Sequence, residues 1–455
     1  MKRFFCVFLV AILCIGCMFS ACAEEIKFYH CIDTWDEGFK LFQASHPDIT
    51  YGRTDEYYSN ASVLAGKLIT RELDSDILGL QLSEINVKEI IEKGYFLDLS
   101  DSTIISNAVS QMISTIAEAG MYDGKIYGLP YFVAFDYWYA DTDAWEQAGL
   151  DISQVPHTFP EFLDFVEAWC ERIEEEPEAN IRIDAEYDPT MYSDSFYTLL
   201  FTGMLLDEYM MQKDYAGEDL TFDADELAPL LERAKELGQR LYEAEPAIQV
   251  SDESFGYSLF KQTTRPSWPN DSNLMVSMRL DESQPKLVRT IVSVLTINSA
   301  TNYPDDCMEL LERMAENPGY ENKPFLYLNS EPVEQKSYAS NLEATKNHIA
   351  ETETKLQDDS LDEEEREELE EALSSYQTVL AQSEETRYVV SPTQLADYQQ
   401  NYGNLYVTIS GTLAAGTDGF NNMTDLKKQF ASGLLSVSDF LSQLNHLAQM
   451  IRLEE

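Results

Sequence analysis

The chain has 455 residues, 44% of them hydrophobic and 12% aromatic, and its 81 Asp and Glu outnumber its 31 Lys and Arg. A chain of this length is expected to fold as two or three domains, with cores large enough to need no disulfide framework. The formal charge of −50 repels nucleic acid and anionic membrane surfaces, so the sequence predicts no nucleic-acid partner.

Residues 1–23 have the pattern of a secretory signal peptide. Lys2 and Arg3 precede a mostly apolar run, 4–18, and an A-x-A cleavage site follows at 21–23. A membrane anchor is less favoured because the apolar run is short. Cleavage before Glu24 is expected, and lipidation at Cys17 or Cys22 is the alternative because each cysteine follows a small residue. We therefore expect an exported protein that is extracellular or held at the cell surface.

Short apolar strands alternate with helical segments in the first 120 residues. Strands are expected at 26–31, near 49–51 and at 75–80, and helices at about 34–44, 83–93 and 107–119. This alternation is typical of an α/β fold with parallel strand pairing.

The densest aromatic run follows in 123–139, DGKIYGLPYFVAFDYWY, with six aromatic residues between Tyr131 and Tyr139. Aromatic rings cover the C–H faces of sugars, and Asp, Asn and Arg bind sugar hydroxyls, so this stretch favours a saccharide ligand. Neighbouring side chains of a strand face opposite sides, so only one set can line a cleft while the other packs in a core. The candidate ligand contacts here are Tyr131, Phe132, Phe135, Asp136 and Trp138.

Three further candidates lie outside this run. Trp268 stands in the segment RPSWPND, 265–271, among prolines and polar residues, and such loops commonly carry binding residues. We expect Trp268 and Arg265 to contact the ligand, with a structural role as an equal alternative. Trp35, at the start of a helix after the first strand, is a lesser candidate on the same reasoning.

The rest of the chain is mostly helical. A capping box of Thr158 and Glu161 predicts a helix start. Helices are also expected near 192–211, 225–242, 305–315 and 436–453, with strands at 288–298 and 325–328. Residues 338–385 are rich in Glu, Gln and Ala, and Leu369, Leu373, Tyr376 and Leu380 form a heptad seam.

These features predict a two-helix hairpin at about 338–387, with a capping box at 360–363 between its halves. The acidic run 362–371 is interpreted as a solvated helix face, because it lacks the glycine and the spacing of a calcium-binding loop.

The sequence shows no catalytic or metal-binding motif. No GxSxG, GxxxxGK[ST] or GxGxxG occurs, and the five histidines have no metal-like spacing. Cys31, Cys170 and Cys307 are expected to be buried free thiols. No catalytic residue, metal or cofactor is predicted. With 81 acidic residues, counting does not exclude a working carboxylate pair, so a secreted carbohydrate-active enzyme is an alternative.

Several short motifs follow one another along nearly the whole mature chain. They are Phe42 with His46-Pro47-Asp48-Ile49, Asp76-Ile77, 93–100 (KGYFLDLS), 123–130 (DGKIYGLP), Pro156 with Thr158, Glu161 and Phe162, Ile297-Asn298-Ser299, and Ser432-Gly433. In this order and spacing the chain resembles the family 1 extracellular solute-binding proteins of bacterial ABC importers, in particular those that take sugars. It departs at Tyr139-Ala140-Asp141, where that family often has Tyr-Asn.

The resemblance implies an α/β, two-lobed, periplasmic-binding-protein-like clamp. Lobe 1 would comprise 24–131 and 292–325, and lobe 2, mostly helical, 132–291 and 326–455. Hinge crossings are implied near 130–135, 288–292 and 323–326. The acidic helical hairpin is longer than the family scaffold needs and is interpreted as an insertion.

The resemblance also implies a function. The chain would be the substrate-binding component of an ABC transporter that captures a mono- or oligosaccharide between its lobes and delivers it to membrane permease subunits. Besides the enzymatic alternative, a surface interaction protein that acts through the acidic hairpin remains a second alternative.

Overall fold

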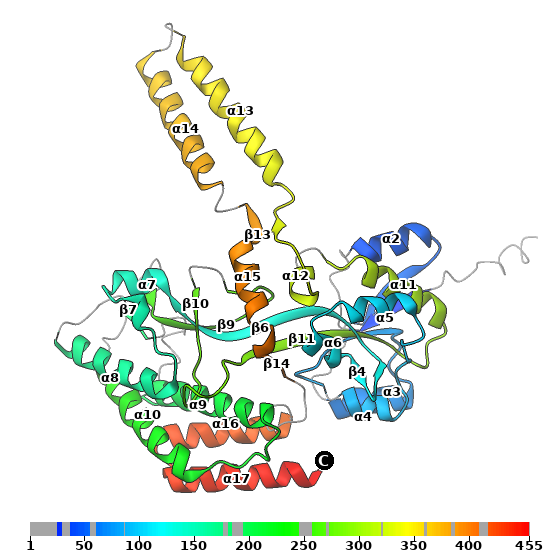
Figure 1. Ribbon diagram of the computed structural model, residues 1–455, viewed down its shortest axis with the longest axis vertical. Coiled ribbons are helices and arrows are strands. Elements are labelled where there is room, and N and C mark those ends of the chain that lie inside the picture. The colour runs from blue at the N-terminus through cyan, green and yellow to red at the C-terminus, as the bar shows by residue number, and fades with distance from the viewer. Residues whose placement is uncertain are drawn as a thin grey trace, which may run out of the picture. The chain divides into compact units, whose positions relative to one another are not determined.

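The computed structural model describes residues 25–29, 37–54, 61–85, 87–175, 181–183, 194–244, 257–269, 273–319, 322–358, 362–383, 387–408 and 417–454 (Figure 1). The chain divides into two compact units. Unit 1 comprises the described residues up to Phe132 with Ile291–Gly319 and Val407–Asn422, and unit 2 comprises Val133–Thr290, Tyr320–Tyr406 and the residues from Met423. The expected two-part α/β organisation is confirmed.

Unit 1 is built on parallel strands. β1 (Glu25–Tyr29) pairs in parallel with β2 (Thr50–Thr54) and β3 (Ile77–Gln81), and β11 (Val288–Ile297) pairs antiparallel with β3. The first four residues of β3 are all buried, as expected for a strand with both faces covered. A short hairpin, β4 (Met121–Tyr122) and β5 (Lys125–Ile126), turns at Asp123 and Gly124, whose φ angles are 48° and 73°.

The helices of unit 1 are α2 (Glu37–Ser45), α3 (Ala61–Thr70), α4 (Val87–Glu92), α5 (Thr103–Ser110), α6 (Ser114–Ala119) and α11 (Pro304–Glu316). The single helix expected at 107–119 is wrong. The side chain of Ser102 accepts a hydrogen bond from the Ile105 amide at 3.2 Å, so α5 begins earlier. The chain then leaves the helix to bury Met112 and Ile113 before α6 starts.

Unit 2 contains the longer part of β6 (Leu129–Asp141), which pairs antiparallel with β9 (Phe260–Arg265) and β10 (Asn273–Val276). The remaining strands are β7 (Ile181–Arg182), β8 (Tyr257–Ser258), β12 (Val333–Glu334), β13 (Tyr388–Val390) and β14 (Leu405–Val407). The boundary between the units falls inside β6 and inside β11, so the chain passes from one unit to the other within both strands.

The helices of unit 2 are α7 (Thr142–Gln147), α8 (Phe159–Glu175), α9 (Phe196–Tyr215), α10 (Ala224–Ala244), α12 (Lys323–Leu326), α15 (Pro392–Gln400), most of α16 (Thr417–Ala431) and α17 (Val437–Glu454), with short turns η1 (Ile152–Gln154) and η3 (Tyr402–Asn404). α10 packs against α8, α9 and α17. The capping box predicted for α8 is confirmed, because Glu161 N donates to Thr158 Oγ1 at 3.3 Å and Thr158 N donates to Glu161 Oε2 at 3.2 Å.

The strand expected at 325–328 is wrong, because Lys323–Leu326 is the helix α12. Pro324 stands in its first turn, where a proline loses no helical hydrogen bond. Cys170 and Cys307 are buried free thiols, as expected, and Cys31 lies outside the described residues. None of the described helices combines the length and apolarity needed to cross a membrane.

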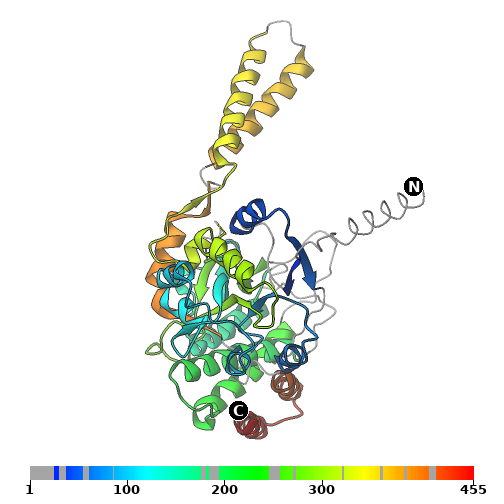
Figure 2. The ribbon, with the colours of Figure 1, turned by 90° about the vertical axis from the view of Figure 1, so that its right-hand side faces the viewer.

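Two helices, α13 (Tyr338–Leu356) and α14 (Glu363–Gln382), follow the predicted hairpin and lie side by side beyond β12 and β13 (Figures 1 and 2). The capping box lies at Asp362 and Glu365, not at 360–363, since the Asp362 side chain accepts from Glu365 N at 2.8 Å. A carboxylate cap is favoured at a helix N-terminus. No residue of α14 is buried. That the hairpin is an insertion stays a prediction.

Candidate functional site

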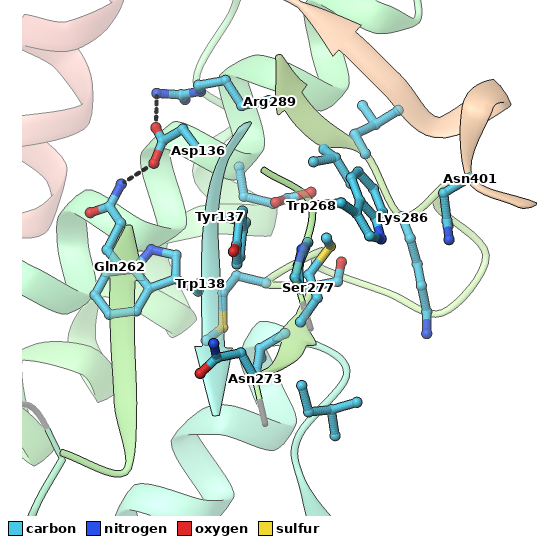
Figure 3. A pocket seen from close by; sticks show the side chains of 18 of the residues that line it. Asp136, Tyr137, Trp138, Gln262, Trp268, Asn273, Ser277, Lys286, Arg289 and Asn401 are labelled. Carbon is cyan, nitrogen blue, oxygen red and sulfur yellow. Dashed lines mark hydrogen bonds and ion pairs between the residues drawn. The ribbon is translucent and has the colours of Figure 1, made fainter. Parts of the chain in front are cut away.

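A cavity of about 430 Å³ lies within unit 2, which is in the size range of small-molecule sites, ~300–1,000 Å³ (Figure 3). Its walls come from β6, β9, β10, the segment 286–289, α9 and α15. Both aromatic and polar side chains face it, so the cavity can present flat apolar surfaces and hydrogen-bonding groups to one ligand.

One polar group of the wall is a network around Asp136 of β6. Gln262 Nε2 donates to Asp136 Oδ1 at 3.0 Å, and Arg289 Nη1 lies 3.6 Å from Asp136 Oδ2 (Figure 3). Each partner comes from a strand beside β6, so the sheet itself fixes the geometry. Trp138 lies on the same side of β6 as Asp136, as the two-residue repeat of a strand requires (Figure 3).

Trp268 faces the cavity from the segment after β9, although only 1% of its surface is exposed. Its Nε1 donates to Asp397 Oδ2 at 2.6 Å, and the Gln394 side-chain amide donates to its backbone carbonyl. Both partners belong to α15 and also line the cavity. The indole is therefore held rigidly, and its neighbours cover almost all of its surface.

Phe135 lies behind this wall rather than in it. Its side chain is fully buried, and its ring packs edge-on against Trp268 at 5.1 Å, Tyr398 at 5.4 Å and Phe325 at 5.6 Å. Tyr398 in turn donates from its hydroxyl to the Phe325 carbonyl at 2.7 Å. We call Phe135, Trp268, Phe325 and Tyr398 the aromatic cluster. Phe135 supports Trp268 and does not reach the cavity.

Tyr137 occupies the opposite side of β6 from Asp136, with Trp268 and Lys286 (Figure 3). Burial raises the pKa of its phenol to about 12, so the hydroxyl is neutral at physiological pH. The buried Ser277 Oγ beside the cavity has no hydrogen-bond partner within the described part of the chain. The Ser277 hydroxyl is therefore open to a ligand or water.

Glu208 of α9 is the most perturbed acid of the cavity wall. It is 8% exposed, and burial raises its pKa to about 7 although Gln212 Nε2 donates to its Oε1 at 2.7 Å. Gln212 Nε2 also donates to the Pro285 carbonyl at 3.0 Å. The glutamate is therefore tied to the segment that carries Lys286 and Arg289.

The cavity thus brings together three predicted residues, Asp136, Trp138 and Trp268. Arg265 is exposed at the end of β9, where its Nε donates to Thr263 Oγ1 at 3.1 Å, and it does not line the cavity.

The other predicted residues lie elsewhere. Tyr131 and Phe132 are half-buried in the part of β6 that belongs to unit 1. Trp35, Cys17 and Cys22 lie outside the described residues. Sequence reasoning missed Tyr137, Glu208 and Arg289. Arg289 could have been identified from the sequence, because it is the one charged residue in the apolar run 288–298 that predicted a strand.

Residues 60–264 match the model of the bacterial extracellular solute-binding proteins. The match covers β6 and α9, which carry Asp136 and Glu208. Over this range the chain is similar to the extracellular solute-binding proteins. The recognition made from the sequence motifs is thereby confirmed. No curated protein matches this chain in sequence.

Solved structures share its fold at low sequence identity. The cyclic α-maltosyl-1,6-maltose binding protein of Arthrobacter globiformis matches with a TM-score of 0.51 and 14% identity, covering 94% of this chain and 98% of that one. UgpB of Mycobacterium tuberculosis in complex with glycerophosphocholine matches with a TM-score of 0.51 and 12% identity, and the match covers 94% of this chain and 98% of that one. A sugar transporter of Rhizobium etli in an open conformation matches with a TM-score of 0.50 and 15% identity, and the match covers 94% of this chain and 99% of that one.

Proposed function

We propose that this protein captures a saccharide in the unit 2 cavity and delivers it to the permease of an ABC importer. The observation that carries the proposal is the cavity wall, where the Trp138 indole lies on the same side of β6 as the Asp136 network and Trp268 adds a second indole from the other side (Figure 3). Two solved structures of similar fold support it. One is described as a cyclic α-maltosyl-1,6-maltose binding protein, and the other as a sugar transporter.

Each part of the wall has a role in this proposal. The indole faces would pack on the C–H faces of a sugar ring, which gives affinity without a charge. Asp136 would accept hydrogen bonds from sugar hydroxyls, and Arg289 and Gln262 hold its carboxylate in place before binding. Bonds to a charged acceptor are worth more than neutral ones, about 1.5–3 kcal/mol each.

We also propose how the protein reaches its place of action. Export through the signal at 1–23 would release it outside the cytoplasm, after cleavage before Glu24 or lipidation at Cys17 or Cys22. Mass spectrometry of the mature protein distinguishes the two. An unmodified N-terminus at Glu24 supports cleavage, and a mass increase on a terminal cysteine supports a lipid anchor.

Titration calorimetry against a panel of glucose, maltotriose, xylotriose and cellotriose tests the proposal, with a dipeptide and spermidine as non-saccharide probes. We expect tight binding of at least one saccharide. Binding confined to the dipeptide or spermidine would contradict the saccharide assignment, and no binding at all would contradict capture in this cavity.

A carbohydrate-active enzyme is the second candidate, and Glu208 is the observation that favours it. A carboxylic acid with a pKa of about 7 in a cavity has the property of a general acid. We propose binding without turnover. Prolonged incubation with each oligosaccharide, followed by chromatography, should return it unchanged, and released shorter sugars would establish the enzymatic function instead.

A further inference from the structure

The Glu208 carboxyl group has one oxygen committed and one oxygen open. Oε1 accepts from Gln212 Nε2 at 2.7 Å, and within the described residues no hydrogen bond reaches Oε2. Gln212 Nε2 also donates a hydrogen bond to the Pro285 carbonyl at 3.0 Å. Together, α9 and the segment leading to Lys286 therefore fix the orientation of the Glu208 carboxyl group. The free oxygen is left for a partner in the cavity that Glu208 lines.

The charges around this group are mixed. Asp207 stands beside it on α9, Arg279 follows β10, and Arg289 comes from β11. Arg289 is shared with Asp136, and Arg279 Nη1 donates to the carbonyls of Glu282 and Gln284 at 2.9 Å each. Neither guanidinium makes a direct ion pair with Glu208. Burial raises the pKa of Glu208 by more than the two arginines lower it.

We propose that Glu208 is a specificity-determining residue, which as a neutral carboxylic acid donates a hydrogen bond from Oε2 to an acceptor oxygen of the bound saccharide. The proposal rests on the proposed function. The ligand would shield Glu208 further from water, so the charged form becomes less favourable in the complex. Binding therefore takes up a proton when the acid is ionised, and the saccharide binds more tightly at low pH than at high pH.

Burial raises the pKa of Glu208 to about 7 in the protein without ligand, so the change in binding affinity with pH falls in a range that calorimetry can cover. Calorimetry with the panel saccharide that binds tightest should show a Kd about tenfold higher at pH 8.5 than at pH 6. Repeating the titration at pH 7.5 in buffers of different ionisation enthalpy should show proton uptake on binding. This second measurement needs no variant.

Glu208→Gln is the sharpest variant because glutamine copies the neutral acid. Its carbonyl can accept from Gln212 while its amide donates into the cavity. We expect Glu208→Gln to keep the low-pH affinity and to lose both the pH dependence and the proton uptake. Glu146→Gln, which removes one exposed charge of α7 outside the cavity, should retain the wild-type profile.

The outcomes separate this inference from the proposed function. A saccharide that binds with the same Kd at pH 6 and 8.5 and without proton uptake would overturn the role of Glu208 alone. An equal pH dependence in wild type and Glu208→Gln would do the same. Absence of saccharide binding at every pH would contradict the proposed function, and the inference with it.

Discussion

The aromatic cluster and the α13–α14 hairpin both contain aromatic side chains, but the two regions bury them to different extents. In the cluster, Phe135 is fully buried and touches three other rings. In the hairpin, Leu373 and Tyr376 are only half-buried, and the Tyr376 ring stacks on that of His348, with 5.2 Å between the ring centroids. Two helices have too few neighbours to enclose a seam. The difference shows that the loss of stability on substitution depends on how many elements enclose a side chain, and not on the composition of the segment.

The largest effect is expected from Phe135→Ala. Removing a fully buried ring leaves a cavity among Trp268, Phe325 and Tyr398, so the free energy of unfolding should fall by about 3–5 kcal/mol. Urea denaturation followed by tryptophan fluorescence measures it. The matched hairpin variant Leu373→Ala should lose no more than about 1 kcal/mol. Equal losses in the two variants would remove the contrast between the regions.

Glu208→Gln should stabilise the protein at alkaline pH. Burial raises the pKa of Glu208 from 4.5 to about 7, so the stability given by the protonated acid is complete below pH 4.5 and is lost as pH rises through 7. At pH 8 the variant should be more stable than wild type by up to about 3 kcal/mol, with little difference at pH 4.5. Thermal melting at both pH values measures this, and a variant less stable than wild type at pH 8 would contradict the assignment.

Asp136→Ala should affect binding more than folding. Asp136 lines the cavity and its partners Gln262 and Arg289 keep contact with water, so saccharide affinity should fall about 10- to 100-fold. Calorimetry gives the affinity, and urea denaturation of the same preparation gives stability. Asp143→Ala, an exposed carboxylate of α7, is the control. Unchanged affinity in Asp136→Ala would place the ligand elsewhere.

The smallest effect is expected from deletion of 338–387 with a short glycine linker. β12 and β13 remain to pair, and the removed helices contribute almost no buried side chains, with Thr352 the exception among described residues. Saccharide affinity should stay within twofold of wild type. Loss of folding would show that the hairpin is structural, and loss of permease stimulation alone would support a partner surface there.

Long amphipathic or apolar segments could be predicted from the sequence. The strand at 288–297, the capped start of α8 and the helices α10 and α17 follow from local patterns that need no knowledge of neighbours. The break between α5 and α6 could not be predicted, because it depends on the burial of Met112 and Ile113 in a core that local patterns do not describe.

The cavity was predicted in part. The aromatic run and the proline-flanked loop indicated Asp136, Trp138 and Trp268, but local alternation could not tell that Phe135 would be enclosed by Phe325 and Tyr398 from distant segments. Glu208 is one of 81 acidic residues and carries no local signal. Its burial arises only when α9 meets the segment at Pro285.

A crystal structure of the protein with the tightest-binding panel saccharide tests the central claim most directly. The account predicts a sugar ring in the unit 2 cavity, packed on Trp138 or Trp268, with a hydroxyl within hydrogen-bond distance of Asp136. A saccharide bound away from all three of these residues would contradict it.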